Sequence, residues 1–456
     1  MSAKSPAVQT KAESPAAEPA AQFADRAEGI EPQAFARNML TVGMKSQQLL
    51  VDFIARMARR EDPGPIDPLN ISGAMMALAK AMSGDREAVL KAQTEWWDGF
   101  MALWESTARR MLGGEAPAVI EPAPGDRRFK AAAWKENEIF DFIKQSYLLT
   151  ANAMQEMVGK LHGLDERERA RVAFYTRQFA DAMAPTNFPL TNPDVLKATI
   201  ASNGENLVKG LDNLLADIER GQGELSIRQS ADGFTVGENI ATAPGKVVFR
   251  NQIMELLQYS PTTDEVYERP LLIFPPWINK FYIIDLRPEN SMVRWLVGQG
   301  YTVFLVSWVN PDARLAQKGF EDYMRDGVFA ALDAVEKATG VKDPNCVGYC
   351  IGGTLLAATL AYMAAQKDKN WGDDRINSAT FWAAQTDFSE AGELSVFVDE
   401  AQLEALKQKM DSEGGVLPGS KMAGAFNMLR ANDLIWSFVI NNYLLGKQPM
   451  PFDLLY

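Results

Sequence analysis

Histidine is almost absent from this chain, whose 456 residues contain one, His162. A zinc site of the His-Glu-x-x-His type needs two histidines, so this chain cannot form one. Cysteine is nearly as rare, with only Cys346 and Cys350. Two cysteines in a chain of this length do not make a disulfide framework. We therefore predict a protein of the reducing cytoplasm, with no metal site.

An excess of positive charge and long apolar runs are also missing. The chain has 46 Lys and Arg against 59 Asp and Glu, a formal net charge of -13. Nucleic-acid binding needs a basic footprint, so it is not expected. The longest uncharged apolar stretch, Ile351–Ala365, is shorter than the ~20 residues of a spanning helix, so no transmembrane segment is expected. Residues 1–32 lack the apolar core of a signal peptide and predict a disordered tail.

Two patterns divide the rest of the chain. From residue 33 to 225, apolar residues recur at three- and four-residue spacing, which predicts a helical domain. Over residues 226–456, short apolar runs alternate with helical stretches, which predicts a mostly parallel sheet covered on both faces. The predicted strands are 247–249, 253–257, 271–274, 302–306, 345–348 and 379–383. A helical pattern at 394–445 follows the last strand, and we interpret it as a lid or cap.

The helical domain carries many large apolar side chains. They include Trp96, Trp97, Met101, Trp104, Phe140 and Phe142. A buried core is one interpretation, and a surface for a partner or a hydrophobic particle is another. The two interpretations are compatible.

The sequence at residues 345–354, Asn-Cys-Val-Gly-Tyr-Cys-Ile-Gly-Gly-Thr, indicates chemistry. It has the form G-x-C-x-G between an apolar strand and an Ala- and Leu-rich helix, which is the nucleophile-elbow pattern with Cys in place of Ser. Glycines in such a turn let the strand and helix backbones approach closely. We predict that Cys350 is the nucleophile and that the backbone N–H of Ile351 is an oxyanion donor. Cys346, inside the strand, is expected in the core.

A cysteine nucleophile suits thioester substrates, because attack on an acyl-CoA exchanges one thioester for another and keeps the acyl group activated. A second oxyanion donor is expected from the loop after the third strand, residues 275–280. The backbone N–H of Trp277 is our candidate. A packing loop with a core tryptophan is an equally open alternative.

Several runs closely resemble class I polyhydroxyalkanoate synthases. They are residues 186–193, 272–286, 303–308 and 310–312, together with the cysteine motif at 348–353. The resemblance implies an α/β-hydrolase catalytic domain preceded by an all-helical N-terminal domain. It implies 3-hydroxyacyl-CoA as substrate, a growing polyester as product, and no separate cofactor, because CoA is part of the substrate. It also implies a homodimer at the surface of cytoplasmic polyester granules, together with granule-coat proteins.

The chain departs from this family at its end. The catalytic Asp and His of the family lie beyond a Trp-Asn-x-Asp stretch, which would begin where this sequence stops, at Tyr456. We therefore expect both residues to be absent, the sheet to be incomplete at its C-terminal side, and the chain alone to be inactive. His162 is expected at the surface or in a helix cap. Asp387 follows the last predicted strand and is expected to have a structural role.

Three functions stay open at this point. The first is an acyltransferase that polymerises 3-hydroxyacyl-CoA through Cys350. The second is a non-catalytic protein that binds granules or a partner through its helices. The third is a hydrolase of the same fold, a polyester depolymerase or a thioesterase.

Overall fold

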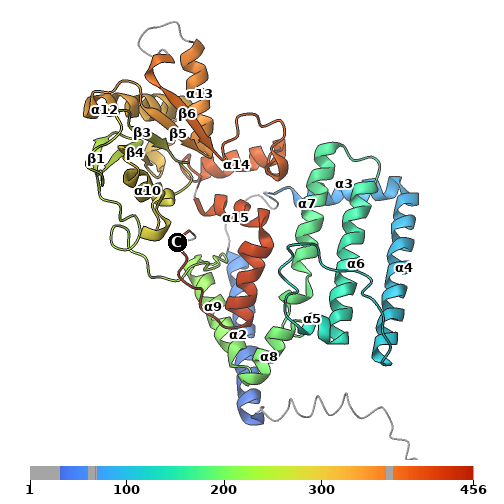
Figure 1. The fold of residues 1–456 in the computed structure, drawn as a ribbon. Coiled ribbons are helices and arrows are strands. Elements are labelled where there is room, and N and C mark those ends of the chain that lie inside the picture. The colour runs from blue at the N-terminus through green and yellow to red at the C-terminus, as the bar shows by residue number, and fades with distance from the viewer. Residues whose placement is uncertain (1–30, 60–66, 68, 366–372, 418, 455–456) are drawn as a thin grey trace, which may run out of the picture.

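The computed structural model of the chain describes residues 31–59, 67, 69–365, 373–417 and 419–454. All but the last two residues of the predicted tail, 1–32, lie outside the described residues. Figure 1 shows a sheet covered by helices at the upper left and a layer of long helices at the right. Helix α15 (Gly419–Leu429) lies between these two parts in this view.

Long helices make up the N-terminal part of the described chain, as predicted. They are α2 (Pro32–Arg59), α3 (Ile71–Gly84), α4 (Arg86–Met111), α5 (Ala133–Glu136), α6 (Glu138–Lys160), α7 (Glu166–Ala182), α8 (Pro193–Ala201) and α9 (Glu205–Arg220). Asp85 begins α4 by accepting a hydrogen bond from the N–H of Ala88, and Asp165 forms a capping box with Glu168 at α7. Helix α6 packs between α4 and α7 (Figure 1).

Six strands form one sheet in the order β1-β2-β4-β3-β5-β6. They are β1 (Gly245–Arg250), β2 (Met254–Tyr259), β3 (Leu271–Phe274), β4 (Val303–Trp308), β5 (Asn345–Tyr349) and β6 (Ser378–Trp382). Strands β1, β2 and β4 pair antiparallel, whereas β4, β3, β5 and β6 pair parallel. Each predicted strand overlaps an observed one, so the prediction of a mostly parallel sheet is confirmed.

Helices cover both faces of this sheet. Successive side chains of a strand point to opposite faces, so each buried strand contributes to both layers of the core. Leu272 of β3 packs in one core cluster with residues of α12 (Ala330–Thr339) and α13 (Ile351–Ala365). Its neighbour Ile273 packs in another cluster with residues of α10 (Met292–Gly298). The central strands β3 and β4 are buried at nearly every position because neither of their faces meets water, whereas β1 and β6 at the sheet edges are mostly exposed.

Shorter helical segments join these elements. They are η2 (Pro185–Asn187), η3 (Phe281–Ile284), η4 (Pro288–Asn290), η5 (Ala313–Leu315), α11 (Phe320–Asp322) and η7 (Asp373–Arg375), together with the π-helix η6 (Tyr323–Phe329). The segment η6 connects α11 to α12, so residues 320–339 form one continuous helical path. No helix among the described residues is both long and apolar enough to cross a membrane.

The segment 392–444 packs on the N-terminal helices. It contains η8 (Gly392–Phe397), α14 (Glu400–Ser412), α15 and the π-helices η9 (Asn432–Trp436) and η10 (Val439–Leu444). Asp399, which caps α14, accepts a hydrogen bond from Asn70 Nδ2 at 2.9 Å and pairs with Arg171. This segment is thus anchored to helices more than 200 residues away. Its role as a lid, predicted for 394–445, stays a prediction.

Candidate active site

Cys350 lies in the turn between β5 and α13. Its φ is 54°, in the left-handed region that residues with a side chain seldom adopt. Its N–H donates to the carbonyl of Trp382 on β6 at 2.8 Å, and its carbonyl accepts from the N–H of Gly353 at 2.8 Å. These bonds hold the strained residue in place. The half-buried thiol stands at the end of the parallel sheet, next to the first turn of a helix.

The glycines around this turn, which we call the elbow (residues 348–353), are required by close backbone contacts. A Cβ on Gly348 would lie 2.4 Å from the Cα of Gly353, and a Cβ on Gly352 would lie 2.2 Å from the carbonyl oxygen of Phe274. Real Cβ atoms do not approach backbone so closely. Strand β5, helix α13 and the end of β3 therefore pack at backbone contact, which the G-x-C-x-G spacing predicts.

Ile351 is the first residue of α13 and follows the candidate nucleophile directly. The first N–H groups of a helix have no acceptor within the helix. Within the described part of the chain, the N–H of Ile351 donates to no other protein group. Together with the helix dipole, such a donor favours negative charge beside Cys350.

Trp277 follows β3, the parallel neighbour of β5. Phe274 is opposite Gly348 in the register, so the two chain segments leave the sheet at the same end. The Trp277 side chain is half-buried and packs edge-on against Trp308, with ring centroids 6.3 Å apart. The side chain therefore packs as a core tryptophan would, while the backbone lies at the edge that carries Cys350. The chemical roles of Cys350, Ile351 and Trp277 stay predictions.

His162 lies away from the elbow, after the end of α6. Its Nδ1 is 2.6 Å from Asp85 Oδ2, and its side chain is 90% exposed. Hydrogen bonds from the side chain and the N–H of His162 lower the pKa of Asp85. His162 thus links the end of α6 to the capping residue of α4 at the surface, as expected.

Asp387 is exposed and holds a turn. Its Oδ1 accepts a hydrogen bond from the N–H of Ser389 at 2.9 Å, and the hydrogen bonds from Ser389 lower its pKa. This contact agrees with the structural role expected for it. No group of three His, Cys, Asp or Glu side chains among the described residues is arranged to hold a metal ion.

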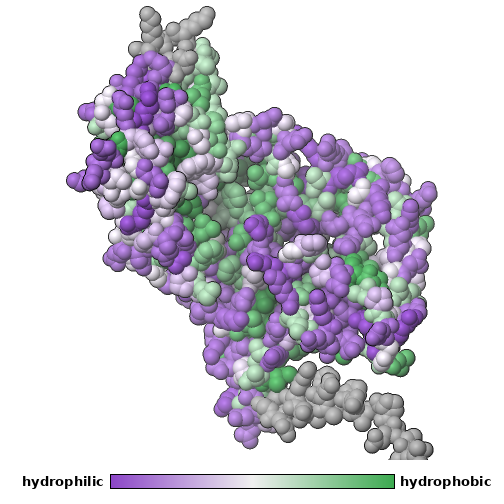
Figure 2. All heavy atoms as spheres, in the orientation of Figure 1, coloured by the Kyte–Doolittle hydropathy of each residue, from purple (hydrophilic) through white to green (hydrophobic). Residues whose placement is uncertain are grey.

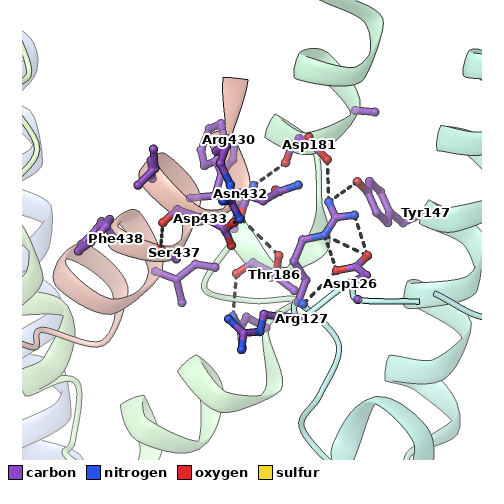
Figure 3. A pocket seen from close by; sticks show the side chains of 18 of the residues that line it. Asp126, Arg127, Tyr147, Asp181, Thr186, Arg430, Asn432, Asp433, Ser437 and Phe438 are labelled. Carbon is purple, nitrogen blue, oxygen red and sulfur yellow. Dashed lines mark hydrogen bonds and ion pairs between the residues drawn. The ribbon is translucent and has the colours of Figure 1, made fainter. Parts of the chain in front are cut away.

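The sequence does not predict a cleft among the described residues that has a volume of about 1430 Å³. Its walls are α6, α7 and the loop before α5 on one side and residues 430–454 on the other (Figure 3). Cys350, Ile351 and Trp277 do not line it. The cleft depends on the packing of segments about 300 residues apart, for which the local sequence carries no signal.

One group of residues that lines this cleft is a network of Arg128 with Asp126, Tyr147 and Asp181, which we call the Arg128 network. Figure 3 labels the three partners of Arg128. Arg128 donates to the Tyr147 hydroxyl at 2.8 Å and to Asp181 at 2.9 Å, and its other two nitrogens bind Asp126. Burial opposes the charge of Arg128, but these partners outweigh it and raise its pKa. Since all three guanidinium nitrogens are bound, we assign this network to structure and the candidate active site to the elbow.

Comparison with known proteins identifies the family of the chain. Residues 125–296 match the family model described as the poly-beta-hydroxybutyrate polymerase (PhaC) N-terminus. The chain is 51% identical over 380 residues to a poly(3-hydroxyalkanoate) polymerase of Methylorubrum extorquens. It is 47% identical over 435 residues to the poly(3-hydroxyalkanoate) polymerase subunit PhaC of Rhizobium meliloti. The chain belongs to the poly(3-hydroxyalkanoate) polymerase family. The resemblance inferred from the sequence is thereby confirmed.

The matches to the polymerase family differ in how much of each protein they cover. The Methylorubrum match covers 83% of this chain and 62% of the relative, and the Rhizobium match covers 93% and 69%. A polymerase subunit PhaC of Cupriavidus necator is 39% identical over 83% of this chain and 62% of its own length. The chain thus spans between three fifths and seven tenths of these polymerases.

Proposed function

We propose that this chain carries the nucleophile of a polyhydroxyalkanoate synthase, an acyltransferase that polymerises 3-hydroxyacyl-CoA and releases CoA. The observation that carries the proposal is Cys350 itself, held at positive φ between β5 and α13 in a chain of the polymerase family. We further propose that the sheet is that of an α/β hydrolase. An elbow after one central strand, beside the loop that follows the neighbouring strand, supports this fold.

The reaction would proceed through two acyl transfers. The Cys350 thiolate attacks the thioester carbonyl, an Sγ–C bond forms, the C–S bond to CoA breaks, and CoA leaves. The hydroxyl of another 3-hydroxyacyl unit then attacks the cysteinyl thioester, forms an ester, and releases the Cys350 thiol. In both steps negative charge develops on the carbonyl oxygen. The N–H groups of Ile351 and Trp277 would stabilise that charge.

Both steps need a general base, and we propose that it lies outside these 456 residues. No histidine follows Cys350 in the sequence, and His162 is bound to Asp85 in the helical layer. The catalytic Asp and His of the resemblance are likewise not in this sequence. The 456 residues alone would therefore not turn over, and the complete gene product would.

The remaining parts of the proposal rest on the family. CoA enters as part of the substrate, so no separate cofactor is needed. The protein would act as a homodimer in the cytoplasm, at the granule surface and with granule-coat proteins. The expected substrate class is 3-hydroxyacyl-CoA, because the relatives are named poly(3-hydroxyalkanoate) polymerases.

The decisive test is release of CoA from 3-hydroxybutyryl-CoA by the complete gene product. We expect Cys350→Ala to abolish turnover, while Cys346→Ala, which removes the other thiol from the core, retains it in the folded fraction. Wild-type turnover in Cys350→Ala would refute the proposal. Labelled polymer offered to the same protein separates the hydrolase alternative, which requires net release of monomer.

A second candidate function, binding to a granule or a partner, is favoured by an aromatic cluster on α4. Trp97 and Trp104 are 54% and 59% exposed, and Trp97 stacks on Phe100 with ring centroids 6.0 Å apart. Figure 2 shows apolar residues at the surface of the helical layer, among charged ones. We expect a Trp97→Ser/Trp104→Ser variant to sediment less with isolated granules. Trp295→Ser, which is equally exposed on α10 at 58%, is the matched control.

A further inference from the structure

The loop that carries Trp277 begins with two prolines, and its first carbonyl depends on a side-chain donor. Neither Pro275 nor Pro276 has an N–H, so the hydrogen-bond ladder of β3 cannot continue through them. Pro275 is buried, and a buried carbonyl without a partner is destabilising. The indole Nε1–H of Trp308 donates to this carbonyl at 2.7 Å.

The Trp308 side chain is itself confined. It is the last residue of β4 and is 9% exposed. A Cβ on Gly327 in η6 would lie 2.7 Å from its Cη2 and 2.8 Å from its Cζ3, so that helix packs directly on the ring. The ring of Tyr323 lies 5.3 Å from it on the same helix. The indole therefore cannot swing away from Pro275 without displacing η6.

The same carbonyl oxygen also faces the elbow. A Cβ on Gly352 would lie 2.8 Å from the Pro275 carbonyl oxygen. Gly352 directly follows Ile351, and Trp277 comes two residues after Pro275. The Pro275 carbonyl oxygen thus lies next to both the Trp308 indole and the start of α13. The separation of the Ile351 and Trp277 N–H groups depends on where this peptide is held.

We infer that Trp308 is a positioning residue of the oxyanion hole, because its indole N–H sets the place of the Trp277 N–H relative to that of Ile351. Trp308 touches no reacting atom and acts through Pro275. This inference rests on the proposed function, since an oxyanion arises only if Cys350 attacks a carbonyl carbon. It adds a residue on β4 to a site otherwise built from β3, β5 and α13.

Trp308→Phe in the complete gene product tests the inference, because phenylalanine keeps an aromatic ring and removes the donor. Loss of a whole oxyanion donor costs about 100- to 1,000-fold in kcat, so a displaced one should cost about tenfold or more. KM for 3-hydroxybutyryl-CoA should change by less than about twofold, since the donor acts on the transition state. Alkylation of Cys350 by iodoacetamide should keep its rate, because that reaction builds no oxyanion. Trp295→Phe, on the exposed face of α10, is the control.

The outcomes separate the inference from the proposed function. An unchanged kcat in Trp308→Phe overturns the inference. An equal decrease in kcat and in the rate of Cys350 alkylation also overturns it, because Trp308 would then support the thiol. Should Trp308→Phe fail to fold, Gly327→Ala displaces the indole without removing it and should also lower kcat while alkylation is retained. Turnover that survives Cys350→Ala defeats the proposed function. If Cys350→Ala abolishes turnover and Trp308→Phe leaves it unchanged, the inference fails and the proposed function stands.

Discussion

The elbow in the sheet region and the Arg128 network in the helical layer both hold their residues in a fixed geometry. The network does so by side-chain hydrogen bonds, and the elbow does so by close backbone packing. In the Arg128 network every guanidinium nitrogen has a partner, so the charged groups bind one another and none is left for a ligand. At the elbow a residue is strained, backbones touch, and the N–H of Ile351 donates to no described protein group. The comparison teaches that a large cleft is not by itself the better candidate, because chemistry needs groups that do not already have partners in the fold.

The Arg128→Ala variant should show the largest effect, which is a decrease in the free energy of unfolding. It leaves the buried carboxylates of Asp126 and Asp181 without their cation, and breaking a buried pair costs about 3–5 kcal/mol. Urea unfolding measures this change, with the exposed pair of Arg314 and Asp312 as control through Arg314→Ala. Reduced kcat in an equally stable Arg128→Ala protein would contradict the structural assignment.

Gly352→Ala should show the next largest effect, which is a decrease in kcat. Its Cβ would lie 2.2 Å from the Phe274 carbonyl oxygen, so the elbow must move. A displacement of this kind costs about 100-fold in kcat. CoA release by the complete gene product is the measurement. The control is Gly159→Ala in α6, where a Cβ meets nothing within 4 Å. Equal activity of the two variants would show that the elbow tolerates displacement.

The two regions should also respond oppositely to acid. Burial acts to raise the pKa of Asp126, but hydrogen bonds from Arg128 outweigh it and lower that pKa. Its contribution is therefore present above the unfolded-state pKa of about 3.9 and lost as the pH falls through the folded value. Burial raises the pKa of Asp285, beside the sheet, above its ordinary value. Protonation of Asp285 in the folded state therefore stabilises the sheet region as the pH falls toward about 4.

Hydrogen exchange followed separately in β3–β5 and in α6 tests this contrast. Between about pH 7 and about pH 4, protection of the strands relative to unfolded peptide should rise, and below that range protection of α6 should fall first. Asp285→Asn, which carries no titrating group, should flatten the rise in the strands. A parallel decline of both regions from neutral pH would contradict the opposite pKa shifts.

His162→Ala should have the smallest effect. The histidine is exposed and bound to Asp85 in the helical layer, so turnover of the complete gene product should change by less than about twofold. Loss of a true general base costs about 100- to 10,000-fold. A decrease of that size would place His162 in the chemistry and would remove the contrast between the two regions.

The sequence predicted those parts of the molecule that depend on near neighbours in the chain. The central strands are apolar at most positions, and the elbow follows from glycines two residues before and after Cys350, so both could be located without a structure. The surface position of His162 followed from its place before Gly163. These features have a local period or spacing, which is the signal that sequence analysis can detect.

Only the tertiary structure decided what packs against these local elements. The pairing of Asp399 with Arg171 and the hydrogen bond from Trp308 to Pro275 join residues that no periodicity relates, 228 and 33 positions apart. Likewise, the packing of residues 392–444 on the N-terminal helices joins side chains far apart in the chain, for which the local sequence carries no signal. By itself the sequence determined the turn that holds Cys350, because backbone sterics act within a few residues. The surroundings of Cys350 were decided by long-range packing, in which many weak contacts act together.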